Sequence, residues 1–324
     1  MASALGAKVR SLLRCPTCKG ELLDDKAQLR CVNPGCQLEF PTPNGVPVLI
    51  DESRSVFLHD DVVGPGPRAF DGSQNPSWRR RLSQRIPDLD SHPWSGEHLQ
   101  RMSGLLSESA REPVVLVVGG AILGNGMDEI ARHPLIELIE SDIYLGPRVQ
   151  LLFDAHDIPF PDESFDGVIA QGVLEHVLDP YRCAAEITRV TKTGGLVYAE
   201  TPFMQQVHGG QHDFTRFTRL GHRRLFRRFH EIESGISIGP GSVLAWSWKY
   251  LLASFCNSPR SRSLAHLVAR LTAFPWKWLD PLLVKNKGSF GAASEYFFLG
   301  RKASNGWYLS DRELLQSYRG IPEG

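Results

Sequence analysis

The sequence predicts an α/β fold in which an open, mostly parallel sheet carries helices on both faces and follows a small metal-binding module. Two observations lead to this prediction. From about residue 96 onward, short apolar runs alternate with helical stretches, which is the pattern of a parallel sheet with crossover helices. Before that, four cysteines stand in two close pairs. The predicted boundaries are 1–51 for the module, 52–95 for a linker, 96–302 for the sheet domain with a helical insertion at 241–290, and 303–324 for a tail.

The composition is that of an ordinary globular chain. Of 324 residues, 42% are hydrophobic and 22% are charged, and 36 basic residues balance 36 acidic ones. No overall field therefore draws the chain to nucleic acid or to an anionic membrane. The first 14 residues lack the apolar segment of a signal peptide, and no run of 18 residues is free of charge. We therefore expect a cytoplasmic protein without a membrane-spanning helix.

The paired cysteines predict a structural zinc site. Two residues separate Cys15 from Cys18, four separate Cys31 from Cys36, and twelve lie between the pairs. Two such knuckles place four thiolates at the corners of a tetrahedron, which is the closed geometry of structural zinc. In a chain without an export signal this spacing favours metal over the alternatives, which are two disulfides or a chance pairing of cysteines. Zinc would supply much of the folding free energy of so small a module and would have no open position for catalysis.

The residues after the second cysteine pair extend this interpretation. Asn44 and Gly45 form a turn signal, and the alternation of Val46, Val48 and Ile50 predicts a terminal strand. Together with the cysteines, this segment resembles the small zinc-ribbon family that activates methyltransferases as a separate subunit, over about residues 8–51. The resemblance implies that the ribbon stabilises or assists its own methyltransferase domain in cis. A solubilising or partner-docking ribbon is the alternative.

Five apolar runs predict the strands of the main sheet, and each ends in glycine or polar residues. The runs are Val114–Val118, Leu135–Ile139, Val149–Phe153, Phe165–Ala170 and Leu196–Ala199.

A helix is predicted between the last two of these runs. Asp179 is its expected N-cap, Pro180 suits its first turn, and the glycine pair at 194–195 is expected to end it. Cys183 lies on the same helical face as the apolar residues of this segment, so we expect it in the core rather than as a reactive thiol.

Ligands of open α/β sheets bind beyond the carboxyl ends of the strands, and polar or glycine residues stand at each of these ends. The first strand is followed by a cluster of glycines, the second by Asp142 with Glu140 as a competing candidate, the third by Asp154 and Ala155, and the fourth by Gln171. A glycine cluster alone also suits a dinucleotide site, so the ordered series is the discriminating signal. The glycines are Gly119, Gly120, Gly124 and Gly126.

The series resembles class I S-adenosylmethionine-dependent methyltransferases of the type 11 group, over roughly residues 112–235. The segments that carry the resemblance are Asp154–Asp166, Val173–Pro180 and Thr193–Leu196. The resemblance implies that S-adenosylmethionine is the cofactor, with its methionine portion at the glycines, its ribose at Asp142 and its adenine at Asp154 and Ala155. The family usually has an acid before the glycines, where this chain has Val117 and Val118. A non-catalytic adaptor with a degenerate methyltransferase fold is therefore an alternative.

The loop after the fifth strand predicts an acceptor pocket. His208, His212, Asp213 and Arg216 stand there among aromatic residues. A similar run occurs in methyltransferases associated with surface glycans and secondary metabolites, which implies a small-molecule, glycan or lipid-linked acceptor. For a hydroxyl acceptor, His176, His208 or His212 is the predicted general base. A structural loop whose histidines bond to the backbone is the alternative.

Three further features complete the interpretation. Six arginines between 216 and 228 predict a solvated face of an amphipathic helix; the alternative, an RNA methyltransferase that binds nucleic acid there, is less favoured. The aromatic-rich insertion at 241–290 is expected to serve ordinary core packing, with a lid, a peripheral membrane contact or a subunit contact as alternatives. A last strand at Tyr296–Leu299 and a capping box at Ser310 and Glu313 follow.

Overall fold

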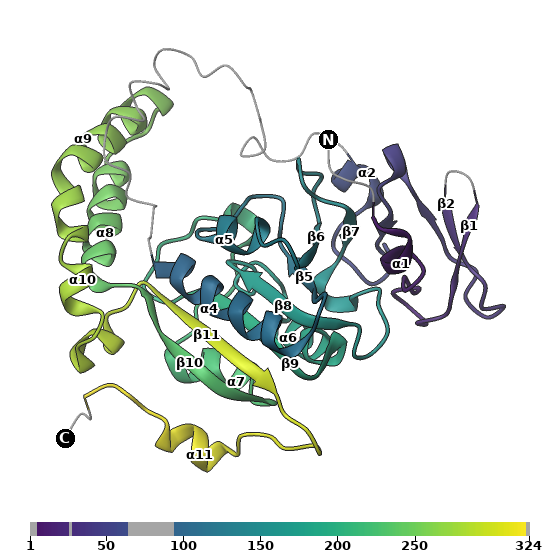
Figure 1. Cartoon of the computed structure of the whole chain (residues 1–324). Helices are drawn as coiled ribbons and strands as arrows, with labels where there is room; N and C mark the ends of the chain where they lie inside the picture. Colours follow the sequence, from purple (N-terminus) through teal and green to yellow (C-terminus); the bar gives the residue numbers. More distant parts are fainter. Residues whose placement is uncertain (1–4, 26–27, 64–93, 322–324) are drawn as a thin grey trace.

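A computed structural model describes residues 5–25, 28–63 and 94–321. The short helix predicted near Trp78–Ile86, with most of the predicted linker, lies outside these residues. The described chain contains an eight-stranded sheet of order β10-β11-β9-β8-β5-β6-β7-β4 and a separate three-stranded sheet, β1-β2-β3 (Figure 1). The predicted α/β class, with its mostly parallel sheet, is confirmed.

The N-terminal module is a small ribbon that donates a strand to the main sheet. It consists of α1 (Ala7–Arg10), β1 (Leu22–Asp25), β2 (Gln28–Cys31) and β3 (Glu39–Pro41), followed by β4 (Val48–Leu49). Strand β4 pairs in parallel with β7 (Leu151–Phe153), with Val48 opposite Leu152. The predicted terminal strand is thus shorter than the alternation suggested. Val48, Leu49 and Ile50 are all buried, because β4 lies between the ribbon and the large domain.

One hydrophobic core spans the ribbon and the large domain. Leu13, Phe40 and Leu49 of the ribbon belong to the same buried cluster as Phe153 and Phe160 of the main sheet domain. A polar contact reinforces this boundary, since the Nζ of Lys19 lies 3.2 Å from a carboxylate oxygen of Glu186. The ribbon is therefore an integral layer of the fold, and its loss would expose core residues of the large domain.

All five predicted apolar runs form parallel strands. Besides β7, these are β5 (Val114–Val118), β6 (Glu137–Asp142), β8 (Phe165–Gln171) and β9 (Thr191–Pro202). Every residue of β5 is buried. Alternate side chains of β5 enter two different clusters, so both faces of the sheet are covered, as a continuous apolar run requires.

Four helices cover the two faces. α4 (Trp94–Ser109) and α5 (Met127–Ala131) pack on one face, and α6 (Pro180–Val190) and α7 (Arg219–Leu225) pack on the other (Figure 1). Asp179 caps α6 and Cys183 is fully buried, so both predictions are confirmed.

The glycine pair at 194–195 does not end α6, contrary to the prediction. The helix ends at Val190, and β9 begins at Thr191. Gly194 has a φ of +79° within β9, where the register against β8 shifts between Phe165 and Gly167. The two glycines therefore form an irregularity at the start of a strand, which a sequence cannot easily distinguish from the end of a helix.

The last two strands are antiparallel to each other, and the predicted insertion lies between them in sequence. β10 (Phe229–Ile238) pairs with β11 (Glu295–Lys302), which also pairs with β9. Between them lie α8 (Pro240–Ser254), α9 (Pro259–Lys277), α10 (Asp280–Leu283) and a short 3₁₀ segment, Lys287–Gly291.

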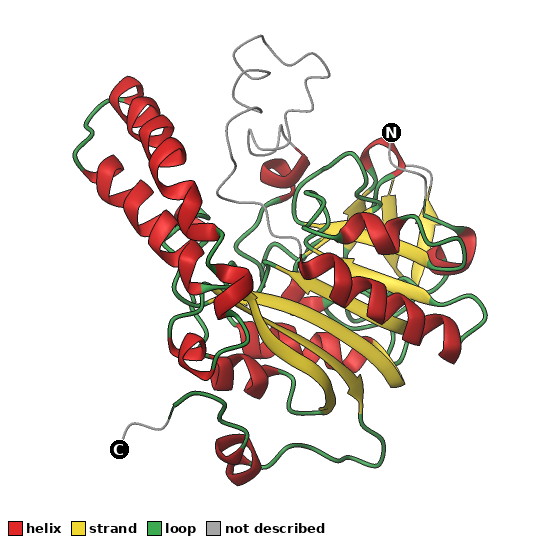
Figure 2. Ribbon diagram, turned by 60° about the vertical axis from the view of Figure 1, so that its left-hand side comes forward, coloured by secondary structure: helices red, strands yellow, loops and turns green. Residues whose placement is uncertain are grey.

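Helices α8 and α9 form a hairpin that projects from the body, at the opposite end of the sheet from the ribbon (Figures 1 and 2). Leu264, Trp278 and Leu282 are 62%, 70% and 72% exposed. The prediction that this insertion serves ordinary core packing is therefore wrong, because its helices pack chiefly on each other and leave many apolar side chains in solvent. None of the described helices combines the length and hydropathy needed to cross a membrane.

Some of the arginines around α7 are buried in contacts rather than part of a solvated face, which corrects a second prediction. Arg219 and Arg223 are buried. Arg219 donates to the carbonyl of Ser317, and Arg223 pairs with Glu231 at 3.2 Å. The spacing of the arginines did not reveal their burial, because Ser317 is distant from Arg219 in sequence and Glu231 stands in the strand that follows the helix. The predicted capping box at the start of α11 (Asp311–Gln316) is confirmed.

We expect one buried histidine to make folding stability depend on pH. His222 of α7 is 2% exposed and packs edge-on against Phe226. Burial, with the positive charges of Arg223 and Arg219, lowers the pKa of His222 from 6.5 to about 3. Below about pH 6.5 the unfolded chain binds a proton at this residue that the folded chain does not, so stability is lost as the pH falls.

Between pH 7.5 and 5.0, we expect the natural chain to lose about 2 kcal/mol more stability than the His222→Leu variant. Urea unfolding of both proteins at the two pH values measures this difference. Equal losses would show that His222 is protonated to the same extent in both states.

Candidate cofactor and acceptor site

The strand order places a crevice at the centre of the sheet. The chain runs outward from β5 to β6 and β7 and then returns to β8 on the other side of β5. Ligands of open α/β sheets bind at such a switch point, beyond the carboxyl ends of the strands. A small open cavity lies there, lined by the end of β5, by the residues that follow β5 and by Glu140, Ile169 and Gln171.

Three of the four predicted glycines line this cavity. They are Gly119, Gly120 and Gly124. Gly119 has a φ of +80°, and a Cβ there would lie 2.3 Å from the Cγ2 of Val173. Gly126 serves a different purpose, because a Cβ there would lie 2.3 Å from the backbone nitrogen of Gly96. It allows α4 to approach, whereas the other three leave room at the crevice.

Gln171 presents an unpartnered oxygen at this cavity. Its Nε2 donates to Glu200 Oε2 at 2.6 Å and to the carbonyl of Asn125 at 3.0 Å. Its Oε1 is buried and has no hydrogen-bond partner, and it lies beside Gly124. A buried acceptor without a donor is costly, so this oxygen is suited to a ligand that carries an N–H or ammonium group.

A buried carboxylate fixes the orientation of that amide. Glu200, at the end of β9, accepts hydrogen bonds from Ser95 and Tyr198 as well as from Gln171. Burial raises the pKa of Glu200, although its donors partly offset the effect. Because both N–H groups of Gln171 are engaged, its carbonyl oxygen is the atom left for a ligand.

The two candidate ribose acids occupy different positions. Asp142 accepts backbone N–H groups from Ala121, Ile143 and Tyr144, at 2.7–3.1 Å, and so shapes the loop beside the crevice. Burial raises the pKa of Asp142. Glu140 lines the cavity itself, and both its oxygens lie 2.8 Å from Arg148 Nε.

The predicted adenine loop contacts the segment that follows the ribbon. Asp154 accepts from the backbone of His156 at 3.0 Å and from the hydroxyl of Ser55 at 2.5 Å. Burial alone would raise the pKa of Asp154, but a hydrogen bond from the His156 ring, with those from Ser55 and the His156 backbone, lowers it. Ala155 is buried next to it, in a 3₁₀ turn at Ala155–Asp157. Neither Asp154 nor Ala155 lines the cavity described above.

Two of the three predicted catalytic histidines come together. The rings of His176 and His208 lie 4.9 Å apart, and their Nε2 atoms are 3.8 and 3.7 Å from Oε1 of Glu175. His212 lies outside this group, because its ring packs 5.6 Å from that of Phe57. Burial disfavours a charged His208, but the Glu175 carboxylate outweighs this effect and raises the pKa of His208.

The loop that carries His208 is braced from within. Asp213 accepts the backbone N–H of His208 at 2.8 Å and forms a two-point ion pair with Arg216. Burial opposes ionisation of Asp213, yet the Arg216 guanidinium holds its pKa well below the usual range. Arg216 also donates to the carbonyls of Gln205 and Gln206. Asp213 and Arg216 thus fix the loop that presents His208.

Sequence reasoning missed the two carboxylates that organise this edge. Glu175 follows β8 and is 2% exposed. Glu200 lies near the carboxyl end of β9 and is 3% exposed. The available signal was their position, since the carboxyl ends of adjacent parallel strands meet at one edge. Glu175 and His176 follow the fourth strand and His208 follows the fifth, so their positions predict that these side chains lie close together.

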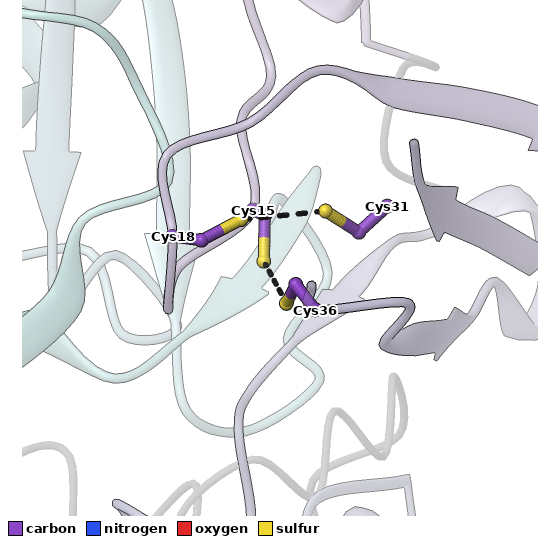
Figure 3. A group of neighbouring side chains, drawn as sticks. All are labelled: Cys15, Cys18, Cys31 and Cys36. Atoms are coloured by element: carbon purple, nitrogen blue, oxygen red, sulfur yellow. Dashed lines mark hydrogen bonds between the residues drawn. The ribbon is translucent and has the colours of Figure 1, made fainter. Parts of the chain in front are cut away.

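The four paired cysteines converge in the ribbon (Figure 3). The sulfurs of Cys15 and Cys36 lie 3.7 Å apart, those of Cys18 and Cys31 lie 3.4 Å apart, and all four lie within 4.8 Å of one another. No disulfide joins them. A tetrahedron with Zn–S bonds near 2.3 Å has edges of about 3.8 Å, so the donor set fits zinc.

Both the sheet domain and the N-terminal ribbon are similar to known proteins. Residues 128–199 match the methyltransferase domain family. An uncharacterized methyltransferase of Mycobacterium sp. (strain JLS) is 30% identical over 128 residues, which are 36% of this chain and 48% of the relative. The chain thus spans about half the length of that relative. The UPF0434 protein of Hahella chejuensis is 36% identical over 59 residues, which are 18% of this chain and 95% of that protein.

Among solved structures, the 1,6-didemethyltoxoflavin-N1-methyltransferase of Burkholderia thailandensis with bound S-adenosylhomocysteine is similar, with 14% identity and a TM-score of 0.37. The match covers 65% of this chain and 81% of that one. The strand order, the glycine crevice and the family match lead to one conclusion. The chain carries a methyltransferase domain, matched over residues 128–199, behind an N-terminal four-cysteine ribbon that belongs to the UPF0434 family.

Proposed function

We propose that this chain transfers a methyl group from S-adenosylmethionine to a small-molecule, glycan or lipid-linked acceptor. The observation that carries the proposal is the cavity at the switch point, which three glycines and Gln171 line and beside which Oε1 of Gln171 has no hydrogen-bond partner. That oxygen suits the ammonium group of the cofactor's methionine portion. It would replace the acid that class I methyltransferases usually have where this chain has Val117 and Val118.

The remaining contacts are assigned by position. Gly119, Gly120 and Gly124 let the backbone approach the methionine portion. Glu140 faces the cavity and Asp142 shapes its loop, so either can accept from the ribose. The adenine would lie against the loop of Asp154 and Ala155. When bound, the cofactor supplies an electrophilic methyl group on a sulfonium.

The chain's own task is then to align the acceptor and exclude water. Methyl transfer needs the attacking atom within about 3–3.5 Å of the methyl carbon and in line with the breaking bond. We propose that Glu175, His176 and His208 bind the polar end of the acceptor, because they form a half-buried group beyond the ends of β8 and β9. The general-base role of the histidines stays a prediction.

We also propose that zinc fills the four-cysteine site and that the ribbon assists the methyltransferase domain in cis. Strand β4 adds to the sheet beside β7, and Ser55, just after the ribbon, donates to Asp154 in the adenine loop. An ordered ribbon would therefore hold the adenine side of the crevice in place.

Transfer of radioactive methyl groups tests the proposed activity. The chain is incubated with methyl-tritiated S-adenosylmethionine and an extract of the organism that encodes it, and the products are separated into organic-soluble, small water-soluble, glycan, RNA and protein fractions. We expect label in one of the first three fractions. Label in RNA would favour the nucleic-acid alternative, and cofactor binding without label in any fraction would favour the adaptor.

A further inference from the structure

We propose that Glu175, His176 and His208 hold a divalent transition-metal ion at the acceptor end of the crevice. Their ligand atoms all lie within 4.8 Å of one another. Two imidazoles and one carboxylate are a common donor set for such ions, and three protein ligands leave coordination positions open. The site is separate from the cysteine cluster and concerns a different kind of ligand.

The hydrogen bonds of the two histidines leave the correct nitrogens for a metal. Nδ1 of His176 lies 2.7 Å from the carbonyl of His212, and Nδ1 of His208 lies 3.2 Å from the carbonyl of Gln206. A carbonyl only accepts, so it favours a proton on each Nδ1 and a lone pair on each Nε2; at His208 the carbonyl is closer than the other neighbour of Nδ1, the Arg216 guanidinium at 3.5 Å. Both Nε2 atoms are the ones that approach Glu175. Backbone carbonyls fix metal-binding histidines in this way in known sites.

The carboxylate of Glu175 lacks the donors that burial requires. Its side chain is 2% exposed, and its Oε2 is buried without a hydrogen-bond partner. The two Nε2 atoms near Oε1, at 3.7 and 3.8 Å, are too distant for hydrogen bonds. A buried carboxylate is normally paired or bound to a metal, so a cation between these three side chains would satisfy it.

The surrounding chain is built to keep this geometry. The ion pair of Asp213 and Arg216 braces the loop of His208. A Cβ at Gly209 would lie 2.5 Å from the ring of His176, so a glycine is needed where the loop passes that ring. If the proposed methyl transfer is correct, an oxygen of the acceptor would fill an open position on the ion, but the binding of metal does not depend on that activity.

Calorimetric titration with Co²⁺ tests the site. The full chain first receives one equivalent of Zn²⁺. The four thiolates take it up, because zinc binds thiolates more tightly than it binds the oxygen and nitrogen donors of the second site. We expect one Co²⁺ to bind per chain. The affinity should fall by at least about tenfold in the Glu175→Gln and His208→Ala variants. It should be unchanged in His212→Ala, whose side chain points away while its carbonyl is retained.

Circular dichroism of each variant establishes that it is folded, and His208 lies on a surface loop where alanine is tolerable. No Co²⁺ uptake by the natural chain, or equal uptake by all four proteins, would overturn the inference. Binding of S-adenosylhomocysteine is measured on the same samples. If that ligand binds and Co²⁺ does not, the metal site fails while the proposed cofactor site stands.

A second inference concerns the projecting hairpin. Along α9 and into α10, exposed apolar residues stand mostly three, four or seven positions apart, spacings that place them on one side of a helix as a stripe. The stripe consists of Leu264, Leu267, Val268, Leu271, Trp278 and Leu282. The opposite side of α9 packs on α8 through Ala269 and Ala273. The stripe therefore faces solvent rather than the partner helix.

The charge of the hairpin indicates what covers this stripe. Residues 240–287 contain seven lysines and arginines and a single acid, Asp280. Asp280 is 2% exposed and accepts hydrogen bonds from Gly241 and Ser242 at the start of α8, so it adds no negative charge to the surface. A second copy of the chain on this face would bring like charges together. We infer that the hairpin docks on an anionic lipid bilayer, with the stripe in the headgroup region.

Sedimentation with lipid vesicles tests this inference. We expect the chain to bind phosphatidylcholine vesicles that contain phosphatidylglycerol, and to bind pure phosphatidylcholine or high-salt samples much less. Leu264→Glu with Leu271→Glu should weaken binding by at least about tenfold. The matched control is Leu315→Glu on α11, which is 68% exposed and outside the hairpin. No binding by the natural chain, or equal binding by the double variant, would overturn the inference. So would a natural chain that is dimeric in solution and becomes monomeric in the double variant.

Discussion

Replacing Cys31 with serine is expected to remove one equivalent of zinc per chain and to unfold the ribbon. Structural zinc in such small modules contributes roughly 10–16 kcal/mol of apparent binding free energy, which equals or exceeds the whole stability of a typical domain. The effect should reach the large domain, because Phe40 and Leu49 of the ribbon share a core with Phe153. Elemental analysis after dialysis and thermal unfolding of the full chain measure both results.

The matched control for this change is Cys256→Ser. Cys256 lies next to α8, far from the cysteine cluster in sequence, and is only partly buried. This variant should keep its zinc content and its unfolding temperature. If Cys31→Ser retained zinc and unfolded at the same temperature as the natural chain, the cysteine cluster would not be a structural metal site.

Replacing Gly124 with valine is expected to lower the affinity for S-adenosylmethionine by at least about a hundredfold, or about 3 kcal/mol. A Cβ at this position would lie 2.0 Å from Oε1 of Gln171. The new side chain would therefore displace the amide and occupy part of the cavity that Gly124 and Gln171 line. Calorimetric titration of the variant with the cofactor gives the affinity directly.

Gly104→Ala is the matched control for that variant. Gly104 lies within α4, and nothing lies within 4 Å of the position of its Cβ. Alanine there should leave cofactor affinity unchanged and stabilise the fold by about 0.5–1 kcal/mol, because glycine is unfavourable inside a helix. Undiminished cofactor binding by folded Gly124→Val would place the cofactor elsewhere.

Local patterns were sufficient to predict most of the sheet. The apolar runs at Val114–Val118 and Phe165–Ala170 needed no knowledge of their neighbours, since strands buried on both faces are apolar throughout. The cap of α6 by Asp179 and the capping box of α11 also depend only on neighbouring residues. The four-cysteine site was also predictable from local sequence, because the spacing of the cysteines within each pair is typical of metal ligands.

The errors concerned contacts between distant residues. Pairing of Val48 with Leu152 joins segments about a hundred positions apart, so the sequence could predict a strand but not its place in the main sheet. Arg219 has its partner at Ser317, and its spacing alone suggested a solvated helix. The insertion was apolar enough for a core, and only the structure reveals that α8 and α9 project from the body.

The candidate site was predictable in part for the same reason. Gly119 and Gln171 follow strands, and the edge of a parallel sheet gathers such residues. The grouping of His176 with His208, and the separation of His212 from them, depend on how the loop after β9 folds back. The ion pair of Asp213 and Arg216 braces that loop, whereas the sequence pattern indicated only that both residues belong to an acceptor pocket.

The most direct measurement is calorimetric titration of the zinc-loaded full chain with S-adenosylhomocysteine. The proposed cofactor site predicts saturable binding at one molecule per chain, lost in Gly124→Val and retained in Gly104→Ala. No binding at millimolar ligand by the natural, folded chain would contradict the proposal that the crevice between β5 and β8 is a cofactor site.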